Sequence, residues 1–326
     1  MKSVLVVRRD NIGDLVCTTP LFSALRRRYP HAWIGALVNS YNAAVLDHNP
    51  DLDSVVVYTK LKHLDPGQSA LGMLAHRMRS LWALRRRGLD CVVLATPLIV
   101  PRLWTLARAL APKRIVGFTE ETLRPVARLH EVERVFALAT QLDLEGPIPP
   151  LRLVPEKALA DRARAAFRAG KPRIAIQIST RRPAQQWPIE RFVELVRRLD
   201  AFGAATMLLW SPGPRDHPRH PGDDEKAAEI SGHLQGTRSF VAYRAGPLPE
   251  LIGALAACDA VITSDGGAMH LAAALHKPIV CFFGDMDPEQ WGPWGVPHRV
   301  LRPESRNAAD IPLDQALAAL RELVAL

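Results

Sequence analysis

Short apolar runs that suit buried strands alternate along this chain with segments that suit helices. The clearest unit spans Val261 to Trp294, where an apolar run, a turn with two glycines, a run of helix formers and a second apolar run follow one another. Alternation at this spacing is typical of parallel sheets with helices on both faces, joined by right-handed connections. The sequence therefore predicts an α/β fold built on doubly wound parallel sheets.

The same reading locates elements along the rest of the chain. Strands are expected at 3–7, 32–38, 54–58, 91–95, 114–117, 173–177, 206–210, 260–262 and 279–283. Helices are expected at 15–28, 39–46, 68–87, 98–110, 131–142, 158–168, 189–199, 248–257, 268–275 and 313–326. Pro20 interrupts the first helical pattern, so it should bend that helix or mark its true start.

The length of the chain predicts two domains, because 326 residues exceed what one core usually holds. Residues 145–150 contain three prolines and a glycine, which continue neither a helix nor a strand. We take this segment as the linker and expect domains at 1–150 and 151–326.

Composition narrows the class of protein. None of the four cysteines lies at metal-ligand or redox spacing, which favours reduced thiols in a cytoplasmic protein. Arg8, Arg9 and Asp10 interrupt the first apolar run, so no signal peptide is expected, and no apolar stretch reaches the length of a membrane span.

The net charge of +9 lies almost entirely in the N-terminal half. A one-sided basic half indicates an anionic partner, such as a nucleic acid, an anionic membrane surface or a phosphorylated acceptor. The plainer alternative is an arginine-rich surface that is simply solvated.

The loop after the first strand contains candidate catalytic carboxylates. Ligands of an open parallel sheet bind outside the carboxyl ends of its strands, so residues 8–14 are a prime location. The loop lacks the G-x-G-x-x-G fingerprint, which argues against a dinucleotide there. Asp14 can remove a proton from an acceptor hydroxyl, or it can simply cap the following helix. Asp10 is the rival carboxylate.

Two loops of the C-terminal half are candidates for anion binding. The turn Ser264–Gly267 opens a helix after a strand, where free N–H groups and the helix dipole favour a phosphate. An ordinary turn without a ligand is the alternative. The other loop, 178–188, carries two adjacent arginines and Trp187, which is more typical of a core anchor than of a base-stacking platform.

Three motifs in this order resemble those of glycosyltransferase family 9, the bacterial heptosyltransferases of lipopolysaccharide core assembly. The first is Gly13-Asp14 followed by Thr19-Pro20, and the second is Trp187-Pro188. The third begins at Asp265-Gly-Gly-Ala-Met-His270 and continues through Lys277-Pro278, Phe283-Gly284, Asp287-Pro288 and Trp291-Gly292-Pro293. The resemblance implies a GT-B-like fold, with two Rossmann-like doubly wound domains facing across a cleft and the last helix packed back on the first domain.

The resemblance also implies roles for residues of both domains. The N-terminal domain would bind the acceptor, with Asp14 as the catalytic base, and the contacts expected beside it are Arg8, Arg9, Asn11 and Gly13. The C-terminal domain would bind the donor, with Asp265 orienting its sugar or ribose hydroxyls and His270 either facing the phosphates or filling the turn. The diphosphate would lie on N–H groups of Gly266, Gly267 and Ala268. The remaining donor contacts are expected at Thr180, Arg181, Arg182 and Gln185.

The chain departs from the family pattern at two donor positions. Gly266 stands where the family usually has Ser or Thr, and Gln185 stands where it has a lysine near the donor phosphates. Arg181 or Arg182 could supply the missing cation, since arginine binds phosphate bidentately. Asp285-Met-Asp287 looks like a D-x-D metal motif, but only Asp287 matches the family loop, where a turn explains it. No metal is expected.

The function implied is an inverting, metal-independent transfer of heptose from ADP-heptose to the lipopolysaccharide inner core. The donor is a co-substrate and no cofactor is expected. The expected partners are the nucleotide-sugar donor, an anionic core acceptor and a membrane surface, with no nucleic acid, in the cytoplasm at the inner face of the inner membrane.

Three alternatives stay open. A protein heptosyltransferase, which modifies Ser or Thr, would have the same donor site. A catalytically weak nucleotide-sugar-binding homologue is suggested by Gln185 and Gly266, although the intact Asp14 argues against it. An epimerase of the same fold would need acid and base carboxylates. A dehydrogenase is disfavoured without the dinucleotide fingerprint.

Overall fold

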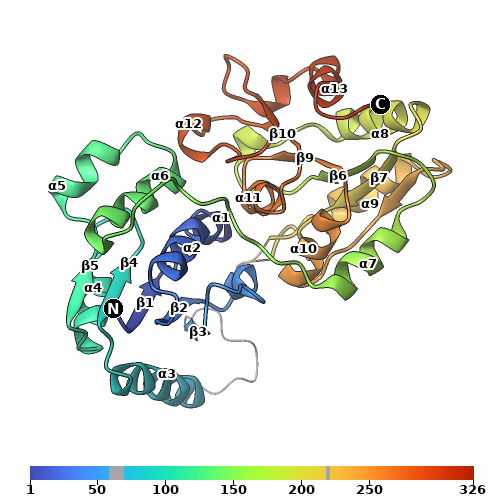
Figure 1. Cartoon of the computed structure of the whole chain (residues 1–326). Coiled ribbons are helices and arrows are strands. Elements are labelled where there is room, and N and C mark those ends of the chain that lie inside the picture. Colours follow the sequence, from blue (N-terminus) through green and yellow to red (C-terminus); the bar gives the residue numbers. More distant parts are fainter. Residues whose placement is uncertain (59–69, 218–220) are drawn as a thin grey trace. The chain divides into compact units, whose positions relative to one another are not determined.

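The structure is a computed structural model that describes residues 1–58, 70–217 and 221–326. The chain forms two compact units, Met1–Leu153 and Val154–Leu326 (Figure 1). Each unit is a parallel sheet with helices on both faces, so the predicted α/β class with doubly wound sheets is confirmed.

The first unit is built on a five-stranded parallel sheet of order β3-β2-β1-β4-β5. Every residue of the central strand β1 is buried, as expected for a strand covered on both faces. The strands are β1 (Ser3–Val7), β2 (Trp33–Asn39), β3 (Ser54–Tyr58), β4 (Cys91–Leu94) and β5 (Arg114–Val116).

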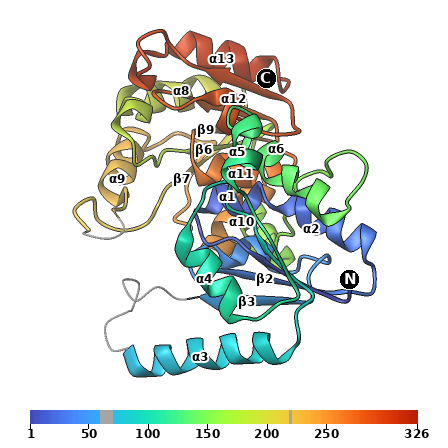
Figure 2. The same cartoon turned by 90° about the vertical axis from the view of Figure 1, so that its left-hand side faces the viewer.

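Helices cover both faces of this sheet (Figure 2). Leu84 of α3 and Leu103 of α4 join a core cluster with Leu5 and Val7, so these two helices lie on one face. The first helical pattern breaks into α1 and α2, and α2 starts one residue before Pro20, which confirms that this proline marks a helix start. The helices are α1 (Ile12–Val16), α2 (Thr19–Arg28), α3 (Ala70–Arg86), α4 (Pro101–Ala109), α5 (Glu120–Leu123) and α6 (Glu131–Phe136).

The ends of several expected helices shift in the structure. The segment expected to be helical at 39–46 contributes only a short 3-10 helix, Ala43–Leu46, and α6 continues as a 3-10 helix over Ala137–Leu142. The expected start of the long helix, at 68 and 69, lies outside the described residues.

The second unit is built on a six-stranded parallel sheet of order β11-β10-β9-β6-β7-β8. Its strands are β6 (Arg173–Gln177), β7 (Ala205–Leu209), β8 (Phe240–Ala242), β9 (Ala260–Ser264), β10 (Ile279–Phe282) and β11 (His298–Leu301). The two edge strands were not expected from the sequence, because each is short and only partly buried.

The helices of the second unit also divide between the two faces of the sheet. One core cluster joins apolar side chains of α8, α9 and α13 to one face of the strands. The helices are α7 (Lys157–Ala166), α8 (Ile189–Ala201), α9 (Asp224–His233), α10 (Leu248–Ala256), α11 (Gly267–Ala274), α12 (Pro288–Trp291) and α13 (Leu313–Arg321).

The last helix, α13, packs within the second unit. Leu317 and Leu320 are buried in the core cluster that includes α8 and β10. Its packing on the first domain, which the family resemblance implies, stays a prediction.

Each sheet has one point where the chain reverses its direction of travel across the strands. In the first unit this point lies between the neighbouring strands β1 and β4, and in the second it lies between β6 and β9. Ligands of open α/β sheets bind in the crevice outside the carboxyl ends of strands at such switch points. The loops that follow β1, β4, β6 and β9 are therefore the places to look for a site.

None of the helices in the described part of the chain is long and apolar enough to cross a membrane.

The packing of α10 on α7 leaves no room for a side chain at Gly253, which can be tested. A Cβ atom added at Gly253 would lie 2.8 Å from Leu159 Cβ, whereas one added at Gly232 of α9 would meet nothing within 4 Å. We expect Gly253→Ala to lower the free energy of unfolding by about 1–3 kcal/mol through overpacking, although alanine favours helix. Gly232→Ala should be neutral or slightly stabilising. Urea denaturation checks both, and equal effects would contradict the packing argument.

Candidate active site

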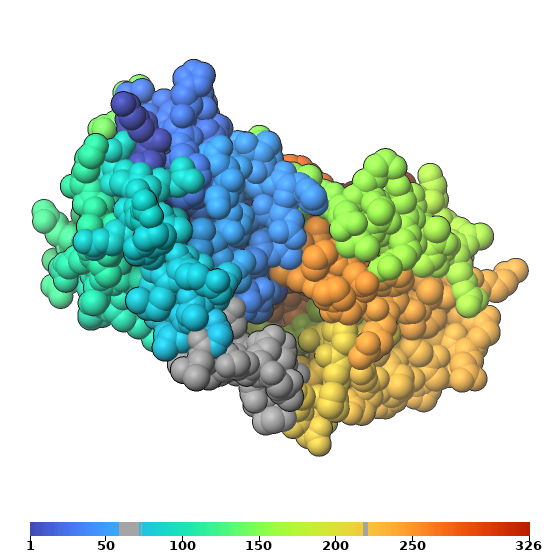
Figure 3. Space-filling view, turned by 90° about the horizontal axis from the view of Figure 1, so that it is seen from below, coloured from blue at the N-terminus to red at the C-terminus, as the bar shows by residue number. Residues whose placement is uncertain are grey.

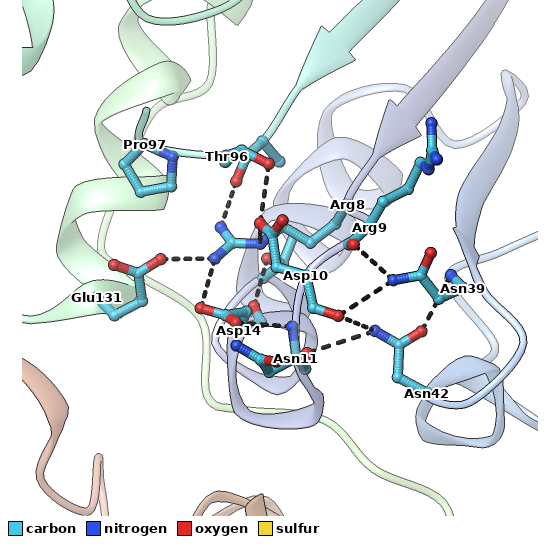
Figure 4. Close-up of polar contacts among 12 residues, drawn as sticks. Arg8, Arg9, Asp10, Asn11, Asp14, Asn39, Asn42, Thr96, Pro97 and Glu131 are labelled. Carbon is cyan, nitrogen blue, oxygen red and sulfur yellow. Dashed lines mark hydrogen bonds and ion pairs between the residues drawn. The ribbon is translucent and has the colours of Figure 1, made fainter. Parts of the chain in front are cut away.

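Arg8 is the centre of the polar cluster at the switch point of the first unit (Figure 4). Its side chain leaves β1 at the carboxyl end, and the residue is only 1% exposed. One guanidinium nitrogen, Nη2, donates to Asp14 Oδ1 at 2.9 Å and to Glu131 Oε1 at 2.7 Å. Nη1 donates to the Ala95 carbonyl after β4, and Nε lies 3.0 Å from Asp10 Oδ2. One buried cation thus connects three carboxylates from two separate segments.

Asp14 is fixed at both of its carboxylate oxygens. Oδ1 accepts from Arg8, and Oδ2 accepts the backbone N–H of Asn11 at 2.8 Å. Asn11 is the N-cap of α1, and Asp14 is the third residue of that helix, so its capping contact is the one to the Asn11 N–H. Each oxygen keeps a further lone pair, because a carboxylate offers about four acceptor sites. The helix-capping role and a role in proton transfer are therefore compatible.

Glu131 anchors the far side of this cluster. It begins α6, it is only 1% exposed, and its second oxygen accepts from Arg134 Nη1 at 3.0 Å. Arg134 in turn donates to the Pro97 carbonyl after β4. Glu131 and Arg134 could not be found from the sequence, because nothing in it indicates that residues so far along the chain return to the β1 loop.

Burial and charge act against each other in the cluster. Burial raises the pKa of Glu131 above its ordinary value, and the neighbouring Arg8 only partly opposes this. Burial on its own would lower the pKa of Arg8, but Asp14, Glu131 and Asp10 outweigh it and raise that pKa. The cluster holds one more carboxylate than it holds guanidinium groups, counting Arg134. Glu131 is therefore the carboxylate of this cluster whose ionised form is opposed by burial.

The rest of the β1 loop is braced by amide side chains. Asn39 Nδ2 donates to the carbonyls of Arg9 and Asp10, and Asn42 Nδ2 donates to the carbonyls of Asp10 and Asn11 (Figure 4). The Arg9 guanidinium carbon lies 3.4 Å from the centre of the Tyr58 ring. These contacts hold the loop in one shape.

The four residues expected to contact the acceptor differ in their exposure to solvent. Asn11 is exposed and Arg9 is half-buried, whereas Gly13 and Arg8 are buried. The Arg8 guanidinium contacts carboxylates and a carbonyl inside the protein. Its expected contact with an acceptor stays a prediction.

At the switch point of the second unit, Gln185 connects the loops after β6 and β9. It is only 2% exposed, and its Nε2 donates to Asp265 Oδ2 at 2.7 Å. Its Oε1 accepts from Thr180 Oγ1 at 3.2 Å, and its backbone carbonyl accepts from Ser264 Oγ at 2.8 Å. Three of the expected donor residues, Thr180, Gln185 and Asp265, are thus brought together in one chain of hydrogen bonds.

Burial also raises the pKa of Asp265, against the hydrogen bond from Gln185 and the charge of Arg182. The Gln185 amide holds this carboxylate without supplying a full positive charge. A hydrogen bond from an uncharged amide fixes the orientation of the carboxylate but offsets little of the cost of burying its charge.

The two adjacent arginines of the β6 loop are exposed. Arg182 Nη1 lies 3.2 Å from Asp285 Oδ2 in a partly exposed ion pair. Asp287 caps α12 by accepting the Glu289 N–H, which confirms its expected role in a turn. In the described part of the chain, no group of three or more acidic, His or Cys residues is placed to hold a metal ion.

The glycine turn after β9 brings backbone close to the surface. Gly266 has φ +157° and is exposed, and the next residues, Gly267 and Ala268, begin α11. A Cβ atom added at Gly266 would meet nothing within 4 Å, so the strain of this backbone conformation is what disfavours other residues there.

Two ring side chains of the second unit, His270 and Trp187, are buried. His270 is buried, and its ring lies edge-on to Trp291 with 6.4 Å between ring centres. Trp187 is buried against Phe192 and Phe282 and donates to the Ile311 carbonyl at 3.0 Å. Its expected role as a core anchor is confirmed.

Comparison with known proteins adds independent information. The model of "Glycosyltransferase family 9 (heptosyltransferase)" matches residues 104–315. Lipopolysaccharide heptosyltransferase 2 of Escherichia coli K12 is 25% identical over 325 residues, which cover 92% of this chain and 87% of that protein.

Solved structures give the same picture of the fold. A family 9 glycosyl transferase from Veillonella parvula matches with a TM-score of 0.81 and 20% identity over 99% of this chain and 97% of that one. The E. coli heptosyltransferase WaaC solved with ADP matches with a TM-score of 0.79 and 21% identity over 99% and 100%. The expected GT-B-like fold of two Rossmann-like domains is therefore confirmed.

The first prediction from this site concerns the buried cation. We expect Arg8→Met to lower the free energy of unfolding by about 3–5 kcal/mol, because it leaves buried carboxylates without their partner. The loss should shrink as pH falls, because burial raises the pKa of Glu131 and its carboxylate takes up a proton first. Urea denaturation at about pH 7 and pH 5 measures it. Arg198→Met, which removes only exposed ion pairs, should change stability little. A similar loss in both variants would show that the buried cluster is not special.

The pH dependence of stability tests the burial of Asp265. Its raised pKa means that folding opposes its ionised form, so the cost appears as pH rises above the unfolded pKa and is complete above the folded pKa. Asp265→Asn removes that cost, and its melting temperature relative to wild type should rise from about pH 4 to pH 7. Lys157 lowers the pKa of the exposed Asp161, so the melting temperature of Asp161→Asn relative to wild type should fall as pH rises from about 2 to 4 and stay level above that. A flat difference for Asp265→Asn would contradict the assignment.

Proposed function

The chain belongs to glycosyltransferase family 9, the heptosyltransferases, and on that basis we propose that it transfers heptose from ADP-heptose to the inner core of lipopolysaccharide. The first unit would bind the acceptor and the second unit the donor. The observation that carries the proposal is the clamped Asp14 carboxylate at the switch point of the first sheet.

Asp14 is the group that we assign as the catalytic base. A sugar hydroxyl that attacks the anomeric carbon of the donor must lose its proton during the attack, and a positioned carboxylate can accept it. The two hydrogen bonds to Asp14 fix its orientation before the acceptor arrives. Arg8 and Glu131 act through Asp14 as positioning residues, since both are buried away from solvent.

This arrangement favours transfer with inversion. One carboxylate is enough for a direct displacement, in which the acceptor attacks opposite the leaving diphosphate. A retaining route through a covalent intermediate would need a second carboxylate acting as a nucleophile. Asp10 is the other carboxylate of this loop, and its contacts with Thr96 and Arg8 both fall on the single oxygen Oδ2. The anomeric configuration of the product therefore decides between the two routes.

The donor would be held by the loops that Gln185 joins. Asp265 would accept hydrogen bonds from hydroxyls of the sugar or ribose, and the N–H groups of Gly266, Gly267 and Ala268 would meet the diphosphate. Arg181 or Arg182 would supply the positive charge that Gln185 lacks, and both are exposed. With charge from arginine and N–H groups, the reaction would proceed without a metal ion. The E. coli heptosyltransferase WaaC, which has the same fold, has been solved with ADP.

The basic N-terminal half supports an anionic acceptor. Phosphorylated lipopolysaccharide core at the inner face of the inner membrane fits this charge, and it would place the enzyme in the cytoplasm as a peripheral membrane protein. A protein acceptor with Ser or Thr hydroxyls would use the same donor and base, so the assay must offer both kinds of acceptor.

The decisive test replaces the Asp14 carboxylate with an amide of the same shape. Asp14→Asn should lower the rate of heptose transfer from ADP-heptose to heptose-free core by about 10²–10⁴-fold, the usual contribution of a general base. Its affinity for ADP in calorimetric titration should stay within a few-fold of wild type, with or without Mg²⁺. NMR of the product reports the anomeric configuration.

Asp10→Asn is the matched control, because Asp10 lies in the same loop and contacts the same arginine. It should lose much less activity than Asp14→Asn. If Asp14→Asn transfers heptose at a near wild-type rate, Asp14 is not the catalytic base. If the enzyme labels a protein and not the lipopolysaccharide core, the acceptor is a protein. Tighter binding of UDP or GDP than of ADP would show that the donor is a different nucleotide sugar.

A further inference from the structure

Helix α3 displays large apolar side chains to solvent. Leu74 is 50% exposed, Met78 is 58% exposed and Trp82 is 59% exposed. These residues are spaced four apart, so they form one stripe along a single side of the helix, which we call the α3 stripe. Among the residues that the structure describes, no other helix exposes a comparable row of large apolar side chains.

The α3 stripe is not the face that holds the helix on its sheet. Leu84 is buried in the core cluster of the first unit and lies on the side of α3 away from Trp82. Leu81, seven residues after Leu74, packs against the same cluster at the edge of the stripe. The helix lies at the outer side of the unit (Figure 2), and the cyan part of the chain that includes it is visible at the surface in Figure 3. Folding of the unit therefore does not account for the stripe.

Positive charge surrounds the α3 stripe. Arg79, Arg85 and Arg86 are exposed, and the Arg86 guanidinium carbon lies 4.5 Å from the Trp82 ring centre. The sequence contains no Asp or Glu between positions 66 and 89. A helix with an apolar stripe, flanking arginines and no acidic residue has the pattern of helices that lie in the interface of an anionic bilayer.

We propose that the α3 stripe docks the first unit on an anionic phospholipid bilayer, with Leu74, Met78 and Trp82 entering the boundary of the acyl chains. Arg79 and Arg86 would contact lipid phosphates, and the aromatic ring of Trp82 would lie at the headgroup level. The biological purpose rests on the proposed function, because a lipid-anchored acceptor is reached most readily by an enzyme that already lies on the membrane.

Charge favours a bilayer over a second copy of the chain. Two copies that packed their α3 stripes together about a two-fold axis would bring arginines of one copy against those of the other. Such a contact would bury like charges beside an apolar surface of modest size. An anionic bilayer satisfies the apolar and the basic residues at once.

Sedimentation with vesicles tests the proposal. Wild type should bind vesicles of phosphatidylglycerol and phosphatidylethanolamine, with binding that weakens as salt increases, and should bind phosphatidylcholine vesicles much less. The variant Leu74→Gln/Met78→Gln/Trp82→Gln keeps good helix formers and should bind at least about tenfold more weakly. Arg79→Gln/Arg86→Gln should weaken binding and flatten its salt dependence.

Matched controls come from the second unit. Phe202→Gln removes an exposed aromatic residue, and Arg168→Gln/Arg238→Gln removes two exposed charges. Neither should alter vesicle binding. Circular dichroism and melting temperature establish that each variant is folded, and the α3 variants should transfer heptose to soluble, delipidated core at the wild-type rate.

The outcomes separate docking from catalysis. Wild type that ignores anionic vesicles, or a folded triple variant that binds them as well as wild type, would overturn the proposal. A wild-type dimer that the triple variant disperses would also overturn it in favour of a second copy. Vesicle binding that depends on α3, in a protein that transfers no heptose, would reject the proposed function and leave the docking surface standing.

Discussion

The first unit depends on one buried positive charge. Arg8 leaves the central strand of the sheet, and water does not reach its guanidinium. A buried ion is tolerated only when partners replace its hydration, and here Asp14, Glu131 and the Ala95 carbonyl do so. The same contacts tie α6 and the β4 loop to the β1 loop. The stability of this edge of the sheet and the geometry of the proposed base therefore come from one set of interactions.

In the second unit a partly buried carboxylate, Asp265, is held by an uncharged amide instead of a cation. Asp265 is partly buried, and its neighbour Gln185 is an amide where the family pattern has a lysine. The amide keeps both loops in place because it donates to one and accepts from Thr180 in the other. In the proposed function, positive charge for a diphosphate would come from the exposed Arg181 and Arg182. Gln185 thus keeps the hydrogen bonds that join the two loops but lacks the positive charge of the family lysine.

The sequence was sufficient for most of the fold. Alternating apolar runs correctly predicted both parallel sheets, and Pro20 correctly marked the start of α2. Prediction failed for β8 and β11, because a short edge strand needs only a few apolar residues and its flanking sequence is polar. It failed for α9 because the apolar residues of that helix are few, with only Ala227 and Ile230 buried.

The candidate site could be predicted only where its residues are close in sequence. Asp14 and Asp265 follow strands whose carboxyl ends were expected to hold ligands, and the family resemblance indicated a role for each. Glu131 could not be found in this way, because it reaches Arg8 through the fold of the whole first unit. The sequence also did not show that Arg8 is buried, since a cation in a loop after a strand is usually taken for a ligand contact.

The burial of Arg8 changes how the basic half of the chain is understood. Its charge is neutralised inside the protein, so it adds nothing to the attraction of an anionic partner. The arginines at the surface of α3 remain available to such a partner, and they flank apolar side chains that water solvates poorly. Net charge counted along the sequence therefore mixes two kinds of arginine: Arg8, which organises the buried cluster around the proposed base, and the surface arginines of α3, which the proposed docking would use.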